Sequence, residues 1–101
     1  MDYKVGLTEE ARNDLGAAVR FIAEEGRNPE AALRLGNELL DAALSLALFP
    51  RRGAPVRRRP GMRKLSHRYW LIFYQVNEAE RWVEIVRIWD GRKDPAALRL
   101  P

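Results

Sequence analysis

Residues 69–76 constrain the fold more than any other stretch, because aromatic and β-branched side chains dominate it. Such side chains suit a pleated, buried strand better than a helix. A second stretch of this kind runs over residues 82–89, and the polar residues 77–81 separate the two. Two strands joined by a short polar link form an antiparallel hairpin. We therefore expect the first stretch to be the central strand of a sheet and the second to be its neighbour.

Two amphipathic helices are expected before this hairpin. Thr8 is a suitable N-cap for the first helix, whose apolar residues recur at helical spacing until Gly26 ends it. Asn28 caps the second helix, Pro29 fits its first position, and Pro50 stops it. The link between the two helices is so short that they must be antiparallel neighbours.

The remaining segments complete an α+β domain. Residues 51–61 hold two glycines, two prolines and five arginines without hydrophobic periodicity, which predicts a loop. Asp94 before Pro95 predicts a short helical turn near the end of the chain. The expected order is β-α-α-β-β-β, a helical hairpin packed on a small, mainly antiparallel sheet. Its strands lie near residues 2–7, 62–66, 69–77 and 81–89.

Length and composition exclude several classes of protein. A chain of 101 residues forms one domain, 1–101, that buries roughly 60 to 70% of its unfolded surface. It has no run of 18 apolar residues, and its acidic start lacks the pattern of a signal peptide, so we expect a cytoplasmic protein without a membrane partner. The absence of cysteine and the single histidine, His67, argue against a metal site, and we expect no cofactor.

Charge is distributed unequally between the two halves of the chain. Residues 1–50 carry five basic and nine acidic side chains, a net charge of −4, whereas residues 51–101 carry thirteen basic and five acidic ones, a net charge of +8. A basic half of this kind either binds nucleic acid or an acidic protein segment, or forms a solvated surface that keeps the protein soluble. The candidate binding residues are Arg57, Arg58, Arg59, Arg63, Lys64, Arg68, Arg92 and Lys93.

A few further residues each have two possible roles. Histidine is the residue type whose ordinary pKa lies nearest neutrality, so His67 is either an acid/base or a solvated residue at a strand turn. If the faces alternate, Arg87 shares a face with Ile85 and Trp89, and it either binds phosphate or pairs with an acidic residue. The large aromatics can stack on bases but are expected to be mainly core: Tyr69, Trp70, Trp82 and Trp89.

The chain from Leu7 to Pro95 resembles the RelE/ParE superfamily, the toxins of bacterial type II toxin–antitoxin modules. The segments that carry the resemblance are LTEEARNDL at 7–15, FPRRG at 49–53, RKL at 63–65, YQV at 74–76 and VRIWDGRKDP at 86–95. The last is close to the superfamily's ending R-I-x-H-G-R-R-D-P. Asp90 stands where many relatives carry histidine.

The resemblance implies two alternative activities. RelE-like members cut mRNA in the ribosomal A site, and the matching candidates here are Arg63, Lys64, His67 and Arg87. ParE-like members have a longer helical hairpin and poison DNA gyrase without a known hydrolytic site. The helices expected here, about 18 and about 20 residues long, are closer to the ParE-like branch. A third reading is a relative that has lost its activity.

Asp90 bears on the choice between these activities. Cleavage of RNA through the 2′-hydroxyl needs a proton acceptor, a proton donor and cations on the phosphate. An aspartate with an unperturbed pKa of about 4 accepts a proton but does not readily donate one at neutral pH, and Asp90-Gly91 is an ordinary turn dipeptide. We therefore expect a ParE-like toxin that binds DNA gyrase, has no catalytic centre of its own, and is neutralised by an acidic antitoxin that folds on binding.

Overall fold

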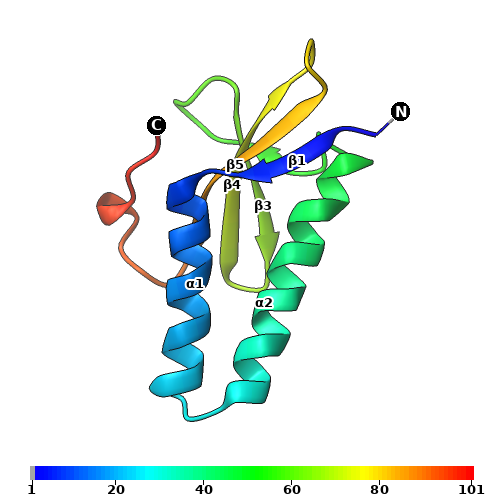
Figure 1. The fold of residues 1–101 in the computed structure, drawn as a ribbon. Coiled ribbons are helices and arrows are strands. Elements are labelled where there is room, and N and C mark those ends of the chain that lie inside the picture. The colour runs from blue at the N-terminus through cyan, green and yellow to red at the C-terminus, as the bar shows by residue number, and fades with distance from the viewer. Residues whose placement is uncertain (1) are drawn as a thin grey trace.

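The structure, a computed structural model, describes residues 2–101 and places two helices over a five-stranded sheet (Figure 1). Met1, which belongs to the predicted domain 1–101 and to the predicted acidic start, lies outside the described residues. The elements in chain order are β1 (Lys4–Leu7), α1 (Glu9–Glu24), α2 (Pro29–Leu44), the 3₁₀ turn η1 (Ser45–Ala47), β2 (Ala54–Pro55), β3 (Met62–His67), β4 (Trp70–Asn77), β5 (Trp82–Asp90) and the 3₁₀ turn η2 (Pro95–Ala97).

The sheet has the strand order β1-β5-β4-β3-β2, so β4 is its central strand as predicted. β1 runs parallel to β5, and every other neighbouring pair is antiparallel. The predicted α+β class, the mainly antiparallel sheet and the β4–β5 hairpin are therefore confirmed.

Both faces of β4 are covered, which explains why its residues form an apolar run without alternation. One face lies beneath the helices, where the core includes Leu39, Leu46, Ile72, Tyr74 and Ile85. The other face carries a smaller cluster, onto which the C-terminal tail packs: Met62, Phe73 and Val86, with Leu98 and Leu100 against them. The tail thus acts as a second cover for a sheet whose first cover is the helical hairpin.

Both helices begin where the sequence predicts. Thr8 accepts a hydrogen bond from the backbone N–H of Ala11 at 3.1 Å, and Asn28 accepts one from Ala31 at 3.0 Å. Each helix is 16 residues long, shorter than expected. The second ends early because the Ser45 hydroxyl donates to the Ala42 carbonyl at 2.6 Å, a local bond that competes with the helical pattern and favours the tighter turn of η1. Within residues 2–101 no helix is long and apolar enough to span a membrane.

The prediction that residues 51–61 form only a loop was wrong, because Ala54–Pro55 pairs with β3 as an edge strand. An edge position tolerates proline, since its missing N–H faces outward. The segment is held by Arg63, which donates to the Gly53 carbonyl at 2.7 Å, and by the Gly53 N–H, which donates to the Tyr74 hydroxyl at 2.8 Å. A Cβ at Gly53 would lie 2.7 Å from that hydroxyl oxygen, so glycine is required there.

A β-bulge in β5 overturns the prediction that Arg87 shares a face with Ile85. Tyr74 pairs with Ile85 and Phe73 pairs with Arg87, so Val86 is an extra residue in the ladder. A residue inserted in this way shifts everything after it to the opposite face.

The aromatic residues only partly follow the prediction of a core role. Trp70 is buried, with 7% of its surface exposed, whereas Tyr69 and Trp82 remain 39% and 37% exposed. Tyr69 lies in the two-residue turn between β3 and β4, where the chain is too short to fold its ring back into the core. Trp82 instead lies over Gly6, whose missing side chain leaves room for the indole ring.

We predict that Tyr74→Phe lowers the free energy of unfolding by about 1 to 3 kcal/mol, because it leaves the buried Gly53 N–H without an acceptor. Burial raises the pKa of Tyr74, so the phenol is neutral and available at physiological pH. Urea denaturation measures the change. Tyr69→Phe, which removes an exposed hydroxyl, is the matched control and should change stability by less than about 0.5 kcal/mol. Equal effects of the two substitutions would contradict the assigned bond.

Candidate functional site

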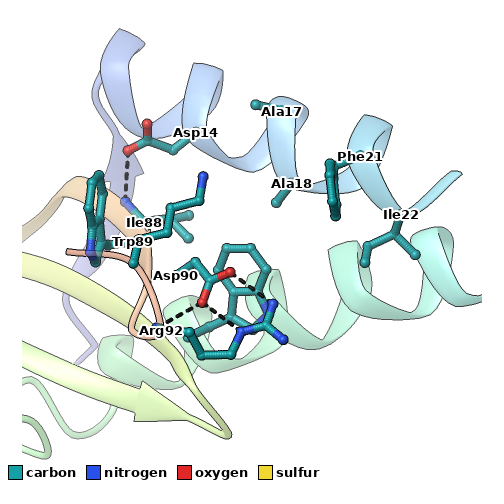
Figure 2. A pocket seen from close by; sticks show the side chains of 11 residues that line it. Asp14, Ala17, Ala18, Phe21, Ile22, Ile88, Trp89, Asp90 and Arg92 are labelled. Carbon is teal, nitrogen blue, oxygen red and sulfur yellow. Dashed lines mark hydrogen bonds and ion pairs between the residues drawn. The ribbon is translucent and has the colours of Figure 1, made fainter. Parts of the chain in front are cut away.

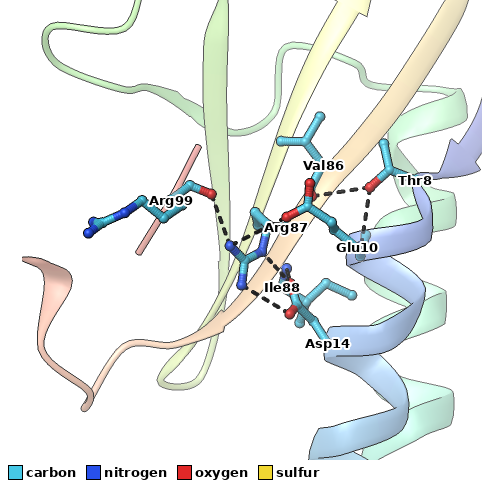
Figure 3. Close-up of polar contacts among 8 residues, drawn as sticks. Thr8, Glu10, Asp14, Val86, Arg87, Ile88 and Arg99 are labelled. Atoms are coloured by element: carbon cyan, nitrogen blue, oxygen red, sulfur yellow. Dashed lines mark hydrogen bonds and ion pairs between the residues drawn. The ribbon is translucent and has the colours of Figure 1, made fainter. Parts of the chain in front are cut away.

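The Asp14 carboxylate joins α1 to the bulged part of β5 (Figure 3). One oxygen accepts from Arg87 Nε at 2.7 Å and from the backbone N–H of Ile88 at 2.9 Å. The other accepts from an Arg87 terminal nitrogen at 3.1 Å. The pair is largely withdrawn from water, with 15% of the Arg87 side chain and 18% of the Asp14 side chain exposed. A bidentate carboxylate–guanidinium pair of this kind holds both groups in one orientation.

The Asp14 carboxylate lies beside β5 at a point that β1 does not reach. β1 pairs with β5 only as far as Leu7 opposite Ile85, so the later backbone groups of β5 lose their strand partner on that edge. Thr8 replaces the partner first, since its N–H donates to the Ile85 carbonyl at 2.9 Å and its hydroxyl to the Val86 carbonyl at 3.2 Å. The Asp14 carboxylate then accepts a hydrogen bond from the Ile88 N–H. The start of α1 therefore continues the pairing that β1 begins.

Arg87 is engaged on every side. Besides its bonds to Asp14, it donates to the carbonyl of Arg99 at 2.9 Å, and its guanidinium lies 5.9 Å from the centre of the Trp89 ring. The hydrogen bonds to Asp14 raise the pKa of Arg87 above its already high ordinary value, so this side chain does not release a proton at physiological pH. In this arrangement Arg87 connects α1, β5 and the C-terminal tail.

At the end of β5, Asp90 stabilises the turn that follows. It accepts from the backbone N–H of Arg92 at 2.9 Å, and its two oxygens accept from the Arg92 side chain at 3.0 and 2.9 Å. The Arg92 guanidinium lies 3.8 Å from the centre of the Tyr69 ring, within cation–π range. The hydrogen bonds from Arg92 hold the pKa of Asp90 below its ordinary value. Asp90 is therefore ionised at neutral pH and cannot serve as a proton donor there.

A groove of about 370 Å³ opens between α1 and this turn (Figure 2). Figure 2 shows Ala18, Phe21 and Ile22 of α1 on one side and Ile88, Asp90 and Arg92 on the other. Ala17, Trp70 and Trp89 add to its apolar lining, and Asp14 and Lys93 add to its charged rim. The helical hairpin extends beyond the β3–β4 turn (Figure 1), so the sheet does not cover the distal part of α1.

The four nuclease candidates do not meet at one point. Arg63 and His67 lie on the helix-facing side of β3, opposite Tyr74 and Trp70, and being four residues apart they are separated by roughly 13 Å. Arg63 binds backbone carbonyls, and His67 Nε2 lies 2.9 Å from an oxygen of Glu38 on α2. Lys64 projects from the opposite face of β3. Arg87, on β5, is held by Asp14 of α1.

The other basic residues divide into paired and unpaired groups. Arg59 donates to the carbonyl of Pro101, Arg68 lies 3.3 Å from an oxygen of Glu38, and Arg92 binds Asp90. Four of the candidate cations form no ion pair or side-chain hydrogen bond with the residues that the structure describes: Arg57, Arg58, Lys64 and Lys93. The first three lie on or beside the loop that joins β2 to β3, so this rim of the sheet presents free positive charge.

Sequence reasoning missed Asp14 and Glu38, the two carboxylates that hold the basic candidates. A usable signal existed for Asp14, because it lies three residues after Ala11 and four before Ala18, both of which are buried. A charged residue on the buried face of a helix indicates a charged partner across the interface. The part of the chain that the structure describes has no cluster of three or more acidic, histidine or cysteine residues that could hold a metal ion.

Comparisons with known proteins agree on the fold. A family model described as "ParE toxin of type II toxin-antitoxin system, parDE" matches residues 5–95. The structure is similar to a chain of the RelBE2 toxin–antitoxin complex of Mycobacterium tuberculosis, with a TM-score of 0.67, 24% identity, and coverage of 87% of this chain and 96% of that one. A chain of the chromosomal ParDE system of P. aeruginosa gives a TM-score of 0.69 and 23% identity, over 85% of this chain and 92% of that one.

A mutant of the E. coli toxin RelE in the free state is also similar, with a TM-score of 0.65 and 17% identity, over 96% of this chain and 88% of that one. No curated protein matches the sequence at a significant level. The predicted superfamily fold is confirmed by these structures.

We predict that Asp14→Asn lowers the free energy of unfolding by about 2 to 3 kcal/mol, because it leaves the largely buried Arg87 guanidinium with only the exposed carboxylate of Glu10, 3.9 Å away, as counter-charge. Chemical denaturation checks this, and Asp41→Asn on the exposed side of α2 is the matched control. If Asp14→Asn were no more destabilising than the control, the carboxylate would not hold α1 on the sheet.

We also predict that the stability contributed by Asp90 depends on pH. A carboxylate whose folded pKa is depressed stabilises the protein above its unfolded pKa of about 3.9, and this stability is lost as pH falls through the lower folded value. At pH 7 Asp90→Asn should cost about 1 kcal/mol, and the difference from the wild type should shrink toward zero as the pH falls through the lowered folded pKa of Asp90. Urea titrations across this range measure it. A difference that stayed constant with pH would contradict the ion pair with Arg92.

Proposed function

Because this chain belongs to the ParE toxin family of type II toxin–antitoxin systems, we propose that it acts by binding DNA gyrase and blocking replication. The observation that carries the proposal is the family match, which spans residues 5–95 and therefore includes both helices and the whole sheet. In this proposal the toxin works as a binding protein, and no residue of it performs hydrolysis.

The placement of the basic residues supports this activity. Cleavage of RNA by a protein without a metal ion needs cations and proton-transfer groups around a single phosphate. Arg63 and Arg87 instead use their guanidinium groups on internal acceptors, and His67 is occupied by Glu38. Asp90, in the place of the superfamily's histidine, is bound by Arg92. None of these groups is available without breaking a contact that stabilises the fold.

Free cations suit the proposed encounter with gyrase. Arg57, Arg58 and Lys64 are exposed on one rim of the sheet, where they would meet the phosphates of gyrase-bound DNA or acidic side chains of the enzyme. Complementary charge of this kind raises the association rate and makes it dependent on salt. Of the remaining basic candidates, Arg59 lies on the same loop. Arg63 binds backbone carbonyls, and Arg68, Arg92 and Lys93 lie at the opposite end of the sheet, near the β3–β4 turn, so we leave these four outside the proposed surface.

An antitoxin is the second proposed partner. The M. tuberculosis relative was solved as a toxin–antitoxin complex, and so was an E. coli RelBE complex that shares the fold with a TM-score of 0.60. Exposed apolar side chains on the helical hairpin provide a surface for such a partner, among them Phe21, Leu33 and Leu44, and Leu48 lies just after η1. An acidic antitoxin segment that folds on binding would cover them and complement the basic half of the chain.

The test separates gyrase inhibition from mRNA cleavage. We expect the purified protein to inhibit DNA supercoiling by gyrase in the absence of ribosomes, and its expression to leave the 5′ ends of a translated reporter mRNA unchanged in primer extension. The variant His67→Gln should inhibit supercoiling within about threefold of the wild type, since His67 lies outside the proposed gyrase surface of Arg57, Arg58 and Lys64. Arg63 is left intact because it holds the Gly53 carbonyl.

Either of two results would overturn the proposal. Cuts in phase with codons that disappear in the His67→Gln variant would establish a ribosome-dependent endonuclease, as in the RelE-like alternative. Strong expression without any growth defect or loss of supercoiling would indicate an inactive relative.

A further inference from the structure

We infer that the free chain forms a symmetric dimer in which the outer faces of two α2 helices pack against each other in antiparallel orientation. The inference goes beyond the proposed function and does not depend on it. Two features carry it, namely a seam of side chains along α2 and the charges beside that seam. The seam is defined by four residues, Leu33, Asn37, Leu40 and Leu44.

The exposed leucines of the described residues all lie on this seam or directly after it. Leu33, Leu40 and Leu44 are 66%, 37% and 56% exposed, and Leu48, just after η1, is 63% exposed. Every other leucine within residues 2–101 is buried or half-buried. An apolar stripe of this kind on the outside of a helix is a surface on which another protein surface can pack.

The seam has the spacing of a coiled coil. Its residues follow one another at intervals of four, three and four positions, the repeat that keeps one stripe of a helix facing a partner helix. The core residues Leu39 and Ala43 lie about a third of a helical turn away from the seam. One side of α2 therefore packs within the chain, and the seam is available to a helix from outside it.

The charges beside the seam complement each other when the second helix runs in the opposite direction. If Leu33 packs opposite Leu44 of a second copy, coiled-coil geometry places Arg34 next to Asp41 of that copy. Arg34 and Asp41 are both exposed, and neither forms an ion pair with the residues that the structure describes. The two-fold axis repeats the contact, so the dimer gains two ion pairs between unlike charges.

A parallel pair of helices would be less favourable. Glu30 continues the seam toward the start of α2, and a parallel pair would place it against Glu30 of the second copy. Like charges placed opposite each other repel. In the antiparallel pair Glu30 instead lies near residues 51–52 of the second copy, both of which are arginine. The dipoles of two antiparallel helices also attract each other.

The dimer is expected to be weak. α2 has 16 residues and is about 24 Å long, so the interface is at the lower end of the size range of specific interfaces. Asn37 lies near the two-fold axis, where a polar residue fixes the register of a coiled coil and lowers its stability. We expect a dissociation constant on the order of 10 to 100 µM. At the lower concentrations of a denaturation experiment the chain is monomeric, and Asp41 is exposed there.

Sedimentation velocity of the purified full chain tests the dimer. Between about 1 and about 300 µM protein, the mass should rise from 11.7 kDa for the monomer toward twice that value. Leu44→Glu should weaken association by at least about tenfold, because it places two carboxylates in the seam. Phe21→Glu is the matched control. It removes an exposed apolar side chain from α1 and adds the same charge outside the seam, so association should stay within about twofold of the wild type.

A charge exchange tests the orientation of the helices. Arg34→Asp and Asp41→Arg should each weaken association by about five- to tenfold, since like charges then face each other twice across the axis. The double variant restores unlike charges and should associate within about twofold of the wild type. Circular dichroism checks that each variant keeps its helices.

Three results would overturn the inference. The first is a chain that remains monomeric at about 300 µM. The second is an equal loss of association for Leu44→Glu and Phe21→Glu, because association would then follow exposed apolar area and net charge alone. The third is a double variant that does not recover, because the two helices would then not meet in the antiparallel register. The readout requires neither gyrase nor toxicity, so failure of the proposed function would leave this result standing.

Discussion

The rest of the structure depends on how the Asp14 carboxylate completes the edge of β5. β1 stops beside Ile85, and a backbone N–H left without an acceptor in a half-buried sheet is costly. Asp14 reaches from α1 to accept from Ile88, and the same group binds the Arg87 guanidinium. One carboxylate therefore sets the distance between helix and sheet and positions Arg87, whose further bond to the Arg99 carbonyl anchors the tail.

That arrangement decides the chemical character of the candidate site. An arginine placed by a bulge and held by an internal carboxylate acts as a structural cation. The same holds at Asp90, where a carboxylate paired with Arg92 shapes a turn. What remains on the surface is a rim of free cations and an apolar groove, and the proposed function assigns the cations to recognition of a partner.

The helical hairpin and the C-terminal tail cover opposite faces of the sheet. The hairpin buries one face, and the tail buries the smaller cluster on the other. Because the helices extend past the β3–β4 turn (Figure 1), the distal part of α1 has no sheet beneath it. The groove is a direct result of this difference in length, since a hairpin as short as β3 and β4 would leave no such space.

The sequence by itself determined the order of the elements, the central place of residues 70–77, both helix N-caps and the turn at Pro95, since each depends on local patterns of caps, periodicity and β-prone side chains. The tertiary structure decided which charges meet. The pairing of Asp14 with Arg87 joins residues 73 positions apart, and that of Glu38 with His67 joins residues 29 apart.

Only the structure likewise revealed the edge strand Ala54–Pro55 and the bulge at Val86, because strand register depends on neighbours that are distant in the chain. A local pattern specifies what a segment becomes. The partner of a polar side chain depends on which surfaces are brought together when those segments pack.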